Sequence, residues 1–397
     1  MQPSTWAERA QAAADSVNEG FGHRLAGFVP GTWIGSIARP ARRVGWPWDP
    51  WHYWWQAHYL DCLVDASWRQ LGTGPHNAMP ETPQRTARDP SSEEPRELRL
   101  AWDLLRGIRD RNFLQYRNAF YDDMAWLALA AGRADQLTER IRHRGLRNAR
   151  TAMRVLGGQL ASADTADGGG GLYWNTKRIF KNTPATSPAA LFFARTGERK
   201  RAQALVDWLG ATLFDPGQGL YLDGINLNRD GTTELMTDVW TYNQGPVLGA
   251  LVALGGPANL ARAEALIAAI DTHLTVGWET HDGARGRTLR GDGAGDGGLF
   301  MGILARYLTV AAVTPSLSTA ARGTAKRLVL DTAEALWSGA EERPAPKDRR
   351  RGETYWTFPQ TPGHAASDEY PPGSRVELST QLQAWMVLEF AHQLTDA

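Results

Sequence analysis

Helical periodicity constrains the fold of this chain more than any other feature of its sequence. Apolar residues recur at spacings of three and four, as in the set Leu98, Ala101, Trp102, Leu105 and Ile108. Such spacing places the apolar side chains on one face of an α-helix. We therefore predict twelve helices, at residues 5–22, 51–71, 93–112, 120–132, 135–163, 184–196, 199–213, 245–254, 258–274, 297–311, 315–338 and 376–394. Alternating patterns typical of strands are confined to short pieces such as Gly219 to Asn226, which we expect to form a hairpin on a loop.

Twelve helices without a substantial sheet exclude doubly wound and TIM-barrel folds, whose parallel strands would appear as β-branched apolar runs between helices. A helical solenoid would show a repeat of fixed length, and no such repeat is visible. Six consecutive helix pairs predict an all-α fold, the (α/α)6 barrel. The Pro-, Gly- and Ser-rich stretches at 73–92 and 340–375 are expected loops. Because similar helices flank both, we predict that residues 1–397 form a single barrel domain.

Charge and composition exclude several functional classes. Lys plus Arg equals Asp plus Glu at 43 each, so no net field would hold a nucleic acid or draw the whole protein onto acidic lipid. The single cysteine, Cys62, cannot form an internal disulfide and lies in an apolar run, which indicates a buried, inert thiol. No segment reaches the roughly 20 apolar residues of a membrane span, and no leader is visible. We expect a monomer that is cytoplasmic as written, or secreted if a leader was removed.

Tryptophan is unusually abundant, with 17 residues, and Trp46, Trp48, Trp51, Trp54 and Trp55 fall within ten positions. Large flat rings fill cores, or they stack on ligands that have apolar faces. Sugars have such faces. Core packing remains the explanation for most of these rings, and sugar stacking remains open for the others.

Two adjacent acids, Asp122 and Asp123, stand at the start of an otherwise apolar helix. Helix capping is one explanation, because acids in a first turn accept backbone N–H bonds and oppose the helix dipole. Glycoside hydrolysis is the other, because it needs two carboxyl groups in different protonation states. Two close carboxylates supply that difference, since one pKa rises when both cannot ionise cheaply. Adjacency also favours the short separation of retaining enzymes over the longer one of inverting enzymes.

Several short sequence motifs resemble those of a known enzyme family. Tyr121-Asp122-Asp123, followed by Trp126, resembles the paired-aspartate motif of glycoside hydrolase family 76, the endo-α-1,6-mannanases. The other blocks that resemble this family are WWQAH at 54–58, GGGLYWN at 169–175, KN at 181–182, WTYNQG at 240–245 and DGGLFMGILARYL at 296–308. The resemblance implies an (α/α)6 barrel, an α-mannan substrate and retention of configuration, with Asp122 matching the nucleophile and Asp123 the acid/base. Met301 stands where the resemblance leads us to expect a lysine.

The same blocks supply the predicted substrate-binding residues. Asn, Gln, Tyr and Asp at a barrel mouth can bond mannose hydroxyls, and aromatic rings can stack on sugar faces. The candidates are Trp54, Gln56, Tyr121, Trp126, Trp174, Asn175, Asn182, Tyr242, Asn243, Gln244 and Asp296. A structural explanation stays open for several of them: Asn175 and Asn243 could satisfy loop backbone, Gln56 could be a buried hydrogen-bonded side chain, and Tyr242 could be core.

Other chemistries fit the sequence poorly. The glycine-rich stretches at 168–171 and 291–297 follow no predicted strand and lack a P-loop ending. An aspartate-rich magnesium motif would need a third acid where Trp126 and Leu127 stand. No His-Glu-x-x-His or Gly-x-Ser-x-Gly motif occurs, so we expect no metal and no organic cofactor. The alternatives kept are a carbohydrate-binding protein without activity, and another (α/α)6 sugar enzyme such as an epimerase or an unsaturated-glycan hydrolase.

Overall fold

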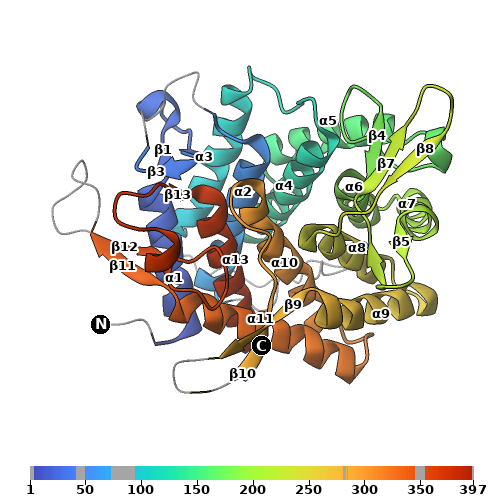
Figure 1. The fold of residues 1–397 in the computed structure, drawn as a ribbon. Coiled ribbons are helices and arrows are strands. Elements are labelled where there is room, and N and C mark those ends of the chain that lie inside the picture. The colour runs from blue at the N-terminus through green and yellow to red at the C-terminus, as the bar shows by residue number, and fades with distance from the viewer. Residues whose placement is uncertain are drawn as a thin grey trace.

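Helices form the body of the molecule (Figure 1), and the computed structural model describes residues 4–41, 50–72, 94–279, 283, 285–344 and 354–395. The helices in these ranges are α1 (Trp6–Gly20), α2 (Tyr53–Gln70), α3 (Arg96–Arg111), α4 (Tyr121–Arg142), α5 (Arg147–Ala163), α6 (Thr183–Arg195), α7 (Arg199–Thr212), α8 (Thr241–Leu254), α9 (Pro257–His273), α10 (Phe300–Ala312), α11 (Thr319–Ser338), α12 (Ala366–Glu369) and α13 (Leu378–Thr395). Short 3-10 turns are η1 (Leu25–Gly27), η2 (Asp167–Gly169) and η3 (Gly295–Leu299). Each of the twelve predicted segments corresponds to a helix, and the four-residue α12 is additional.

The helices close into a ring of six pairs. Helices α2, α4, α6, α8, α10 and α13 each pack against the next, and α13 packs against α2 to complete the inner ring. Helices α1, α3, α5, α7, α9 and α11 pack outside them. The predicted all-α, (α/α)6 architecture is confirmed.

Inner and outer helices differ in how much of their surface they bury. The inner helix α10 buries every residue after Phe300, from Met301 to Ala312. The outer helix α3 buries one stripe, which includes Leu98, Ala101 and Leu105. This difference follows from position, because an inner helix has protein on all sides and an outer helix faces water along one side. It also explains why the three-and-four spacing is clearest in outer helices.

The strands are short and lie at the periphery of the helical body (Figure 1). They are β1 (Gly22–His23), β2 (Ile34–Gly35), β3 (Ala38–Arg39), β4 (Phe180–Asn182), β5 (Phe214–Asp215), β6 (Leu220–Tyr221), β7 (Gly224–Leu227), β8 (Thr233–Met236), β9 (Thr275–Glu279), β10 (Arg285–Leu289), β11 (Glu341–Pro344), β12 (Thr354–Thr357) and β13 (Val376–Glu377). All pairs are antiparallel: β1 with β2, β9 with β10, β11 with β12, β3 with β13, β5 with β6, and β7 between β4 and β8.

The hairpin predicted at 219–226 is wrong. The segment contributes β6 and part of β7, which belong to two different sheets. Each half pairs with a neighbour outside the segment, so the two halves do not pair with each other. The predicted loop at 340–375 likewise contains the β11–β12 hairpin and α12, whereas 73–92 lies outside the described residues.

The helix break predicted between residues 132 and 135 is also wrong, because α4 continues to Arg142. Arg133 lies inside the barrel and donates hydrogen bonds to the carboxylates of Asp61 and Asp65 in α2. This contact keeps the middle of the helix in place. The helix ends at His143, whose φ of 55° is left-handed. None of the described helices is both long enough and apolar enough to cross a membrane.

Candidate active site

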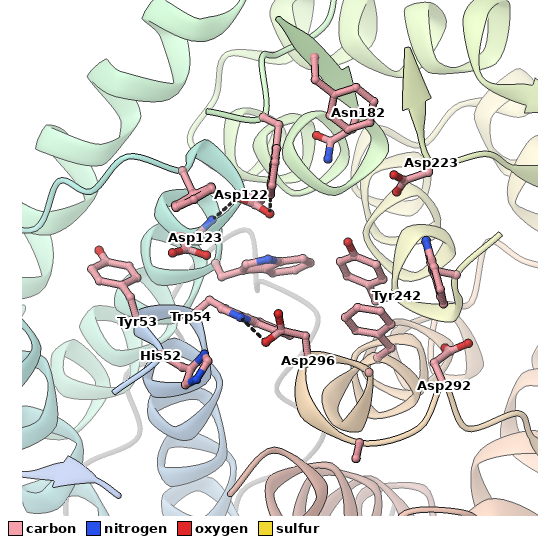
Figure 2. A pocket seen from close by; sticks show the side chains of 18 residues that line it. His52, Tyr53, Trp54, Asp122, Asp123, Asn182, Asp223, Tyr242, Asp292 and Asp296 are labelled. Carbon is pink, nitrogen blue, oxygen red and sulfur yellow. Dashed lines mark hydrogen bonds between the residues drawn. The ribbon is translucent and has the colours of Figure 1, made fainter. Parts of the chain in front are cut away.

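A cavity of about 790 Å³ opens where the inner helices begin (Figure 2). Its lining residues are His52, Tyr53, Trp54, Phe120, Asp122, Asp123, Trp126, Trp174, Phe180, Asn182, Asp223, Trp240, Tyr242, Asp292, Ala294, Asp296, Gly297 and Phe300. Five of the six inner helices contribute residues from their first turns or from the positions just before them. A helix N-terminus carries unpaired N–H groups and the positive end of the helix dipole, so this end of the barrel suits acids and hydroxylated ligands.

The start of α4 is fixed by the chain that passes beside it. The Tyr121 N–H donates to the Trp174 carbonyl at 2.8 Å, and Phe120 forms a β-bridge with Asn175. Neither of the two acids at this helix start serves as the N-cap residue, because Phe120 occupies that position and makes no side-chain capping bond. Figure 2 shows the carboxyl groups of Asp122 and Asp123 side by side on one wall of the cavity.

Uncharged donors hold the two carboxyl groups. The indole Nε1 of Trp174 donates to Asp122 Oδ2 at 3.0 Å, and the Asp123 backbone N–H donates to Asp122 Oδ1 at 3.0 Å. Asp123 accepts a hydrogen bond from the Asn118 carboxamide, with 2.5 Å between Nδ2 and Oδ2. Each carboxylate oxygen of Asp122 therefore accepts a hydrogen bond from a different donor, and Asp123 accepts one from Asn118.

Burial dominates the electrostatics of the pair. Loss of solvent raises the pKa of Asp122 to about 7, although the Asp123 N–H and the Trp174 indole pull it down. Burial raises the pKa of Asp123 well above its ordinary value, and the negative charge of Asp122 raises it further. Asp123 therefore holds its proton more tightly than Asp122. At a pH above about 7, Asp122 is mostly ionised and the pair keeps a single proton.

Three further aspartates line the cavity, and each has its own neighbours. Asp296 accepts hydrogen bonds from the indole nitrogens of Trp54 and Trp55, at 3.1 and 2.9 Å. Asp292 accepts from Arg290 at 3.0 Å and from the backbone and hydroxyl of Thr241, the first residue of α8.

Asp223, the last of the three, stands just before β7. Burial raises its pKa, and the Asn243 amide contacts it at 3.3 Å. Among the described residues, no three His, Cys, Asp or Glu side chains are arranged to hold a metal ion.

Aromatic rings complete the wall opposite the paired acids. Tyr242 stacks on Phe300 with ring centres 3.8 Å apart and planes 11° apart, and Trp240 contacts the same phenyl ring edge-on. Trp54 and Trp126 both contact the ring of the buried His58. Flat rings and carboxylates in one cavity provide both stacking faces and hydrogen-bond acceptors for a polyhydroxylated ligand.

The cavity brings together eight of the residues singled out in the sequence. They are Asp122, Asp123, Trp54, Trp126, Trp174, Asn182, Tyr242 and Asp296. Asn182 has a second contact, because its side-chain oxygen accepts the Ala185 N–H and caps α6. Tyr242 combines both explanations considered for it, since it packs on Phe300 and lines the cavity.

The other five predicted residues do not line the cavity. Gln56 bonds both backbone groups of Gly35, and Gln244 does the same for Tyr221. Asn243, in the first turn of α8 and not in a loop, contacts Asp223.

Tyr121 is buried, and the Asn175 side chain accepts the Lys177 N–H. Gln56, Gln244 and Asn243 thus hold backbone groups or a lining residue, and none of the five lines the cavity itself.

Several lining residues were not selected from the sequence. Asp223 lies in the segment predicted to be a hairpin, and Asp292 lies in the glycine-rich stretch at 291–297, so neither acid was selected as a site residue. Trp240 and Phe300 belong to blocks 240–245 and 296–308 and could have been selected by their aromatic character. His52 and Phe180 flank such blocks by one or two positions, and periodicity does not distinguish a cavity-facing ring from a core ring.

A helical barrel whose mouth holds paired carboxyl groups among aromatic rings defines a carbohydrate-active hydrolase, and comparison with known proteins agrees. The model of glycosyl hydrolase family 76 matches residues 9–360. This chain belongs to that family and is a glycoside hydrolase. Comparison with curated proteins gives no significant match.

Solved structures of the α-1,6-mannanase from Salegentibacter sp. HEL1_6 are similar over 98% of this chain and 100% of theirs. The first is 28% identical, with a TM-score of 0.72. An inactive variant in complex with α-1,6-mannotriose is 27% identical, with a TM-score of 0.72. A second inactive variant, in complex with α-1,6-mannotetrose, is 27% identical, with a TM-score of 0.73. In both variants two consecutive aspartates are replaced, by asparagine in one and by alanine in the other.

Proposed function

We propose that this glycoside hydrolase is an endo-acting α-1,6-mannanase that cleaves α-mannan with retention of configuration. The observation that carries the proposal is the placement of Asp122 and Asp123. Both carboxyl groups line one cavity, uncharged donors hold them, and their pKa values are raised to different extents. A retaining glycosidase needs this combination of one ionised and one protonated carboxyl group.

Similarity to the Salegentibacter enzyme supports the substrate. That enzyme is an α-1,6-mannanase, and its inactive variants, which bind mannotriose and mannotetrose, lack two consecutive aspartates. In this chain consecutive aspartates occur once, at Asp122 and Asp123. The complexes with oligosaccharides of three and four units favour action on a chain of linked mannoses over action on a single sugar.

The two acids take different roles because they hold the proton with different strength. Asp123 donates its proton to the glycosidic oxygen while ionised Asp122 attacks the anomeric carbon, which forms a glycosyl ester and releases the leaving chain. Asp123, now ionised, then removes a proton from water. That water displaces Asp122 from the sugar and restores the original protonation states.

The remaining lining residues bind and orient the sugar. Figure 2 shows Asn182, Asp223 and Asp296 around the same space as the paired acids, where they can bond mannose hydroxyls. Trp54, Trp126 and Tyr242 provide stacking faces. Trp174 is a positioning residue, because it contacts the nucleophile and holds it through the indole N–H.

Incubation of the protein with linear and branched α-1,6-mannans, followed by mass analysis, tests the proposal. We expect a ladder of short α-1,6-mannooligosaccharides from the linear polymer. NMR of the first product should show the α-anomer, as retention requires. Binding of mannooligosaccharides by calorimetry without any product would instead identify a carbohydrate-binding protein and end the mannanase proposal.

A further inference from the structure

Two neighbouring loops expose large apolar side chains to solvent. Phe113 and Leu114, just after α3, are 83% and 72% exposed, and Ile179, just before β4, is 58% exposed. A single exposed apolar side chain is common, but two successive ones, Phe113 and Leu114, with Ile179 on the adjoining loop, indicate a contact surface. We call residues 111–119 and 175–179 the rim surface.

The two loops of the rim surface are joined to each other beside the cavity. The Thr176 N–H donates to the Ala119 carbonyl at 2.9 Å, and the bridge between Phe120 and Asn175 joins the two loops. The first loop carries Asn118, which bonds Asp123, and the second directly follows Trp174, which bonds Asp122. Whatever covers the rim surface therefore lies next to the mouth of the cavity.

The first loop is built to hold its apolar side chains outward. Phe113 and Leu114 have φ values of 54° and 61°, a conformation that bulky residues rarely adopt, here at two successive positions. The Asn112 carboxamide bonds the carbonyls of Gln115 and Arg117, at 2.9 and 2.8 Å. This small turn prevents the two apolar side chains from folding back onto the barrel.

Charge identifies the kind of partner. The segments 111–121 and 172–182 contain no acid, and Arg117, Lys177 and Arg178 are all exposed. The chain as a whole is neutral, so this basic character is local. Apolar side chains flanked by cations suit the surface of a bilayer that contains anionic lipids.

A sugar polymer fits the rim surface less well. Stacking on a sugar needs a flat ring, and the leucine and isoleucine at the rim have none.

We propose that the rim surface docks the enzyme onto a membrane that contains anionic lipids. Phe113, Leu114 and Ile179 enter the headgroup region, and the basic side chains contact lipid phosphates. Docking does not depend on the proposed function.

Co-sedimentation of the whole protein with vesicles tests the proposal. We expect binding to vesicles of phosphatidylcholine and phosphatidylglycerol in low salt, and about tenfold weaker binding to phosphatidylcholine alone. Replacing all three apolar residues by serine (F113S, L114S and I179S) should reduce binding at least about tenfold. The double variant Arg117→Glu and Lys177→Glu should remove the preference for anionic lipid, as should high salt.

The matched control is Val276→Ser, which removes another exposed apolar side chain, from β9. It should bind vesicles as the unaltered protein does. Equal sedimentation with anionic and neutral vesicles, or unchanged binding by the triple serine variant, would overturn the proposal. So would light scattering that shows a dimer which the triple variant cannot form, because a second copy of the chain would then cover the surface.

The rate at which the triple serine variant cleaves soluble α-1,6-mannooligosaccharides distinguishes failure of the proposed function from failure of the docking surface. We expect this rate to equal that of the unaltered protein. If the unaltered protein cleaves nothing yet binds anionic vesicles, the proposed function fails and the docking surface stands. If it cleaves normally and binds no vesicles, the docking surface fails alone.

Discussion

Two pairs of aspartates in the barrel, Asp61 with Asp65 and Asp122 with Asp123, differ in the charge of the side chains that contact them. Asp61 and Asp65 in α2 contact the guanidinium groups of Arg133 and Arg306, whereas Asp122 and Asp123 contact an indole and a carboxamide. Burial alone would raise the pKa of Asp61, but the charges of Arg306 and Arg133 outweigh burial and leave that pKa lowered.

Without such cations the pKa of Asp122 rises to about 7 and that of Asp123 rises further. The charge of the neighbours thus distinguishes the ion-paired acids from the pair that we propose to be catalytic.

Removing either cavity acid should have the largest effect. Asp122→Asn and Asp123→Asn should each lower kcat/KM on linear α-1,6-mannan by about 10³-fold or more, because one variant lacks the proposed nucleophile and the other the proposed acid. Reducing-end assays measure this loss, with circular dichroism to verify folding. Asp207→Asn, a change in an exposed ion pair on α7, is the control and should retain activity. Near-normal turnover by either cavity variant would refute the assigned mechanism.

Breaking the structural pair should reduce stability. Arg133→Met leaves buried aspartates short of a cation, which should lower the free energy of unfolding by about 3–5 kcal/mol. Urea unfolding followed by tryptophan fluorescence measures the change. Arg150→Met removes an exposed arginine from two surface ion pairs and should cost far less. Equal losses for the two variants would mean that the interior ion pairs do not stabilise the barrel.

Neutralising a cavity acid should have the opposite effect on stability. The pKa of Asp122 is higher in the folded chain, about 7, than its ordinary value of 3.8, so ionised Asp122 destabilises the fold. This cost is absent below pH 3.8, grows as the pH rises, and is complete above pH 7.

Asp122→Asn should therefore be more stable than the unaltered protein at pH 8, by no more than about 4 kcal/mol. Thermal unfolding from pH 4 to pH 8 tests this, and a gain that does not grow with pH would contradict it.

The smallest expected effect concerns the indole that contacts Asp122. Trp174→Phe removes a hydrogen bond to the ionised carboxylate, so the pKa of Asp122 should rise and the acid limb of kcat/KM should move up by about one pH unit. Activity near pH 7 should fall about fivefold, because the ionised fraction of Asp122 drops, and it should recover at higher pH. Trp240→Phe, which changes another lining ring, should raise KM without moving the limb. A loss in Trp174→Phe that is equal at every pH would indicate a merely structural role.

The sequence by itself determined the helices and the position of the paired acids. Helical periodicity is a local property of neighbouring residues, so twelve segments could be located, and Asp122-Asp123 could be placed at a helix start. The ordered blocks at 54–58, 169–175 and 240–245 indicated the family. The middle of α4 was missed because the predicted helix ended at Gly132, whereas α4 continues through Arg133, whose side chain contacts Asp61 in another helix.

Only the tertiary structure decided which residues face the cavity. Asp223 and Asp292 reach it because β7 and the approach to α10 come together at the barrel mouth, a placement that spacing along the chain does not encode. The side chains of Gln56 and Gln244 hydrogen-bond the backbone of Gly35 and Tyr221 and do not face the cavity. The unequal pKa values of the paired acids also arise in three dimensions, because burial and the approach of Trp174 and Asn118 depend on how distant segments pack.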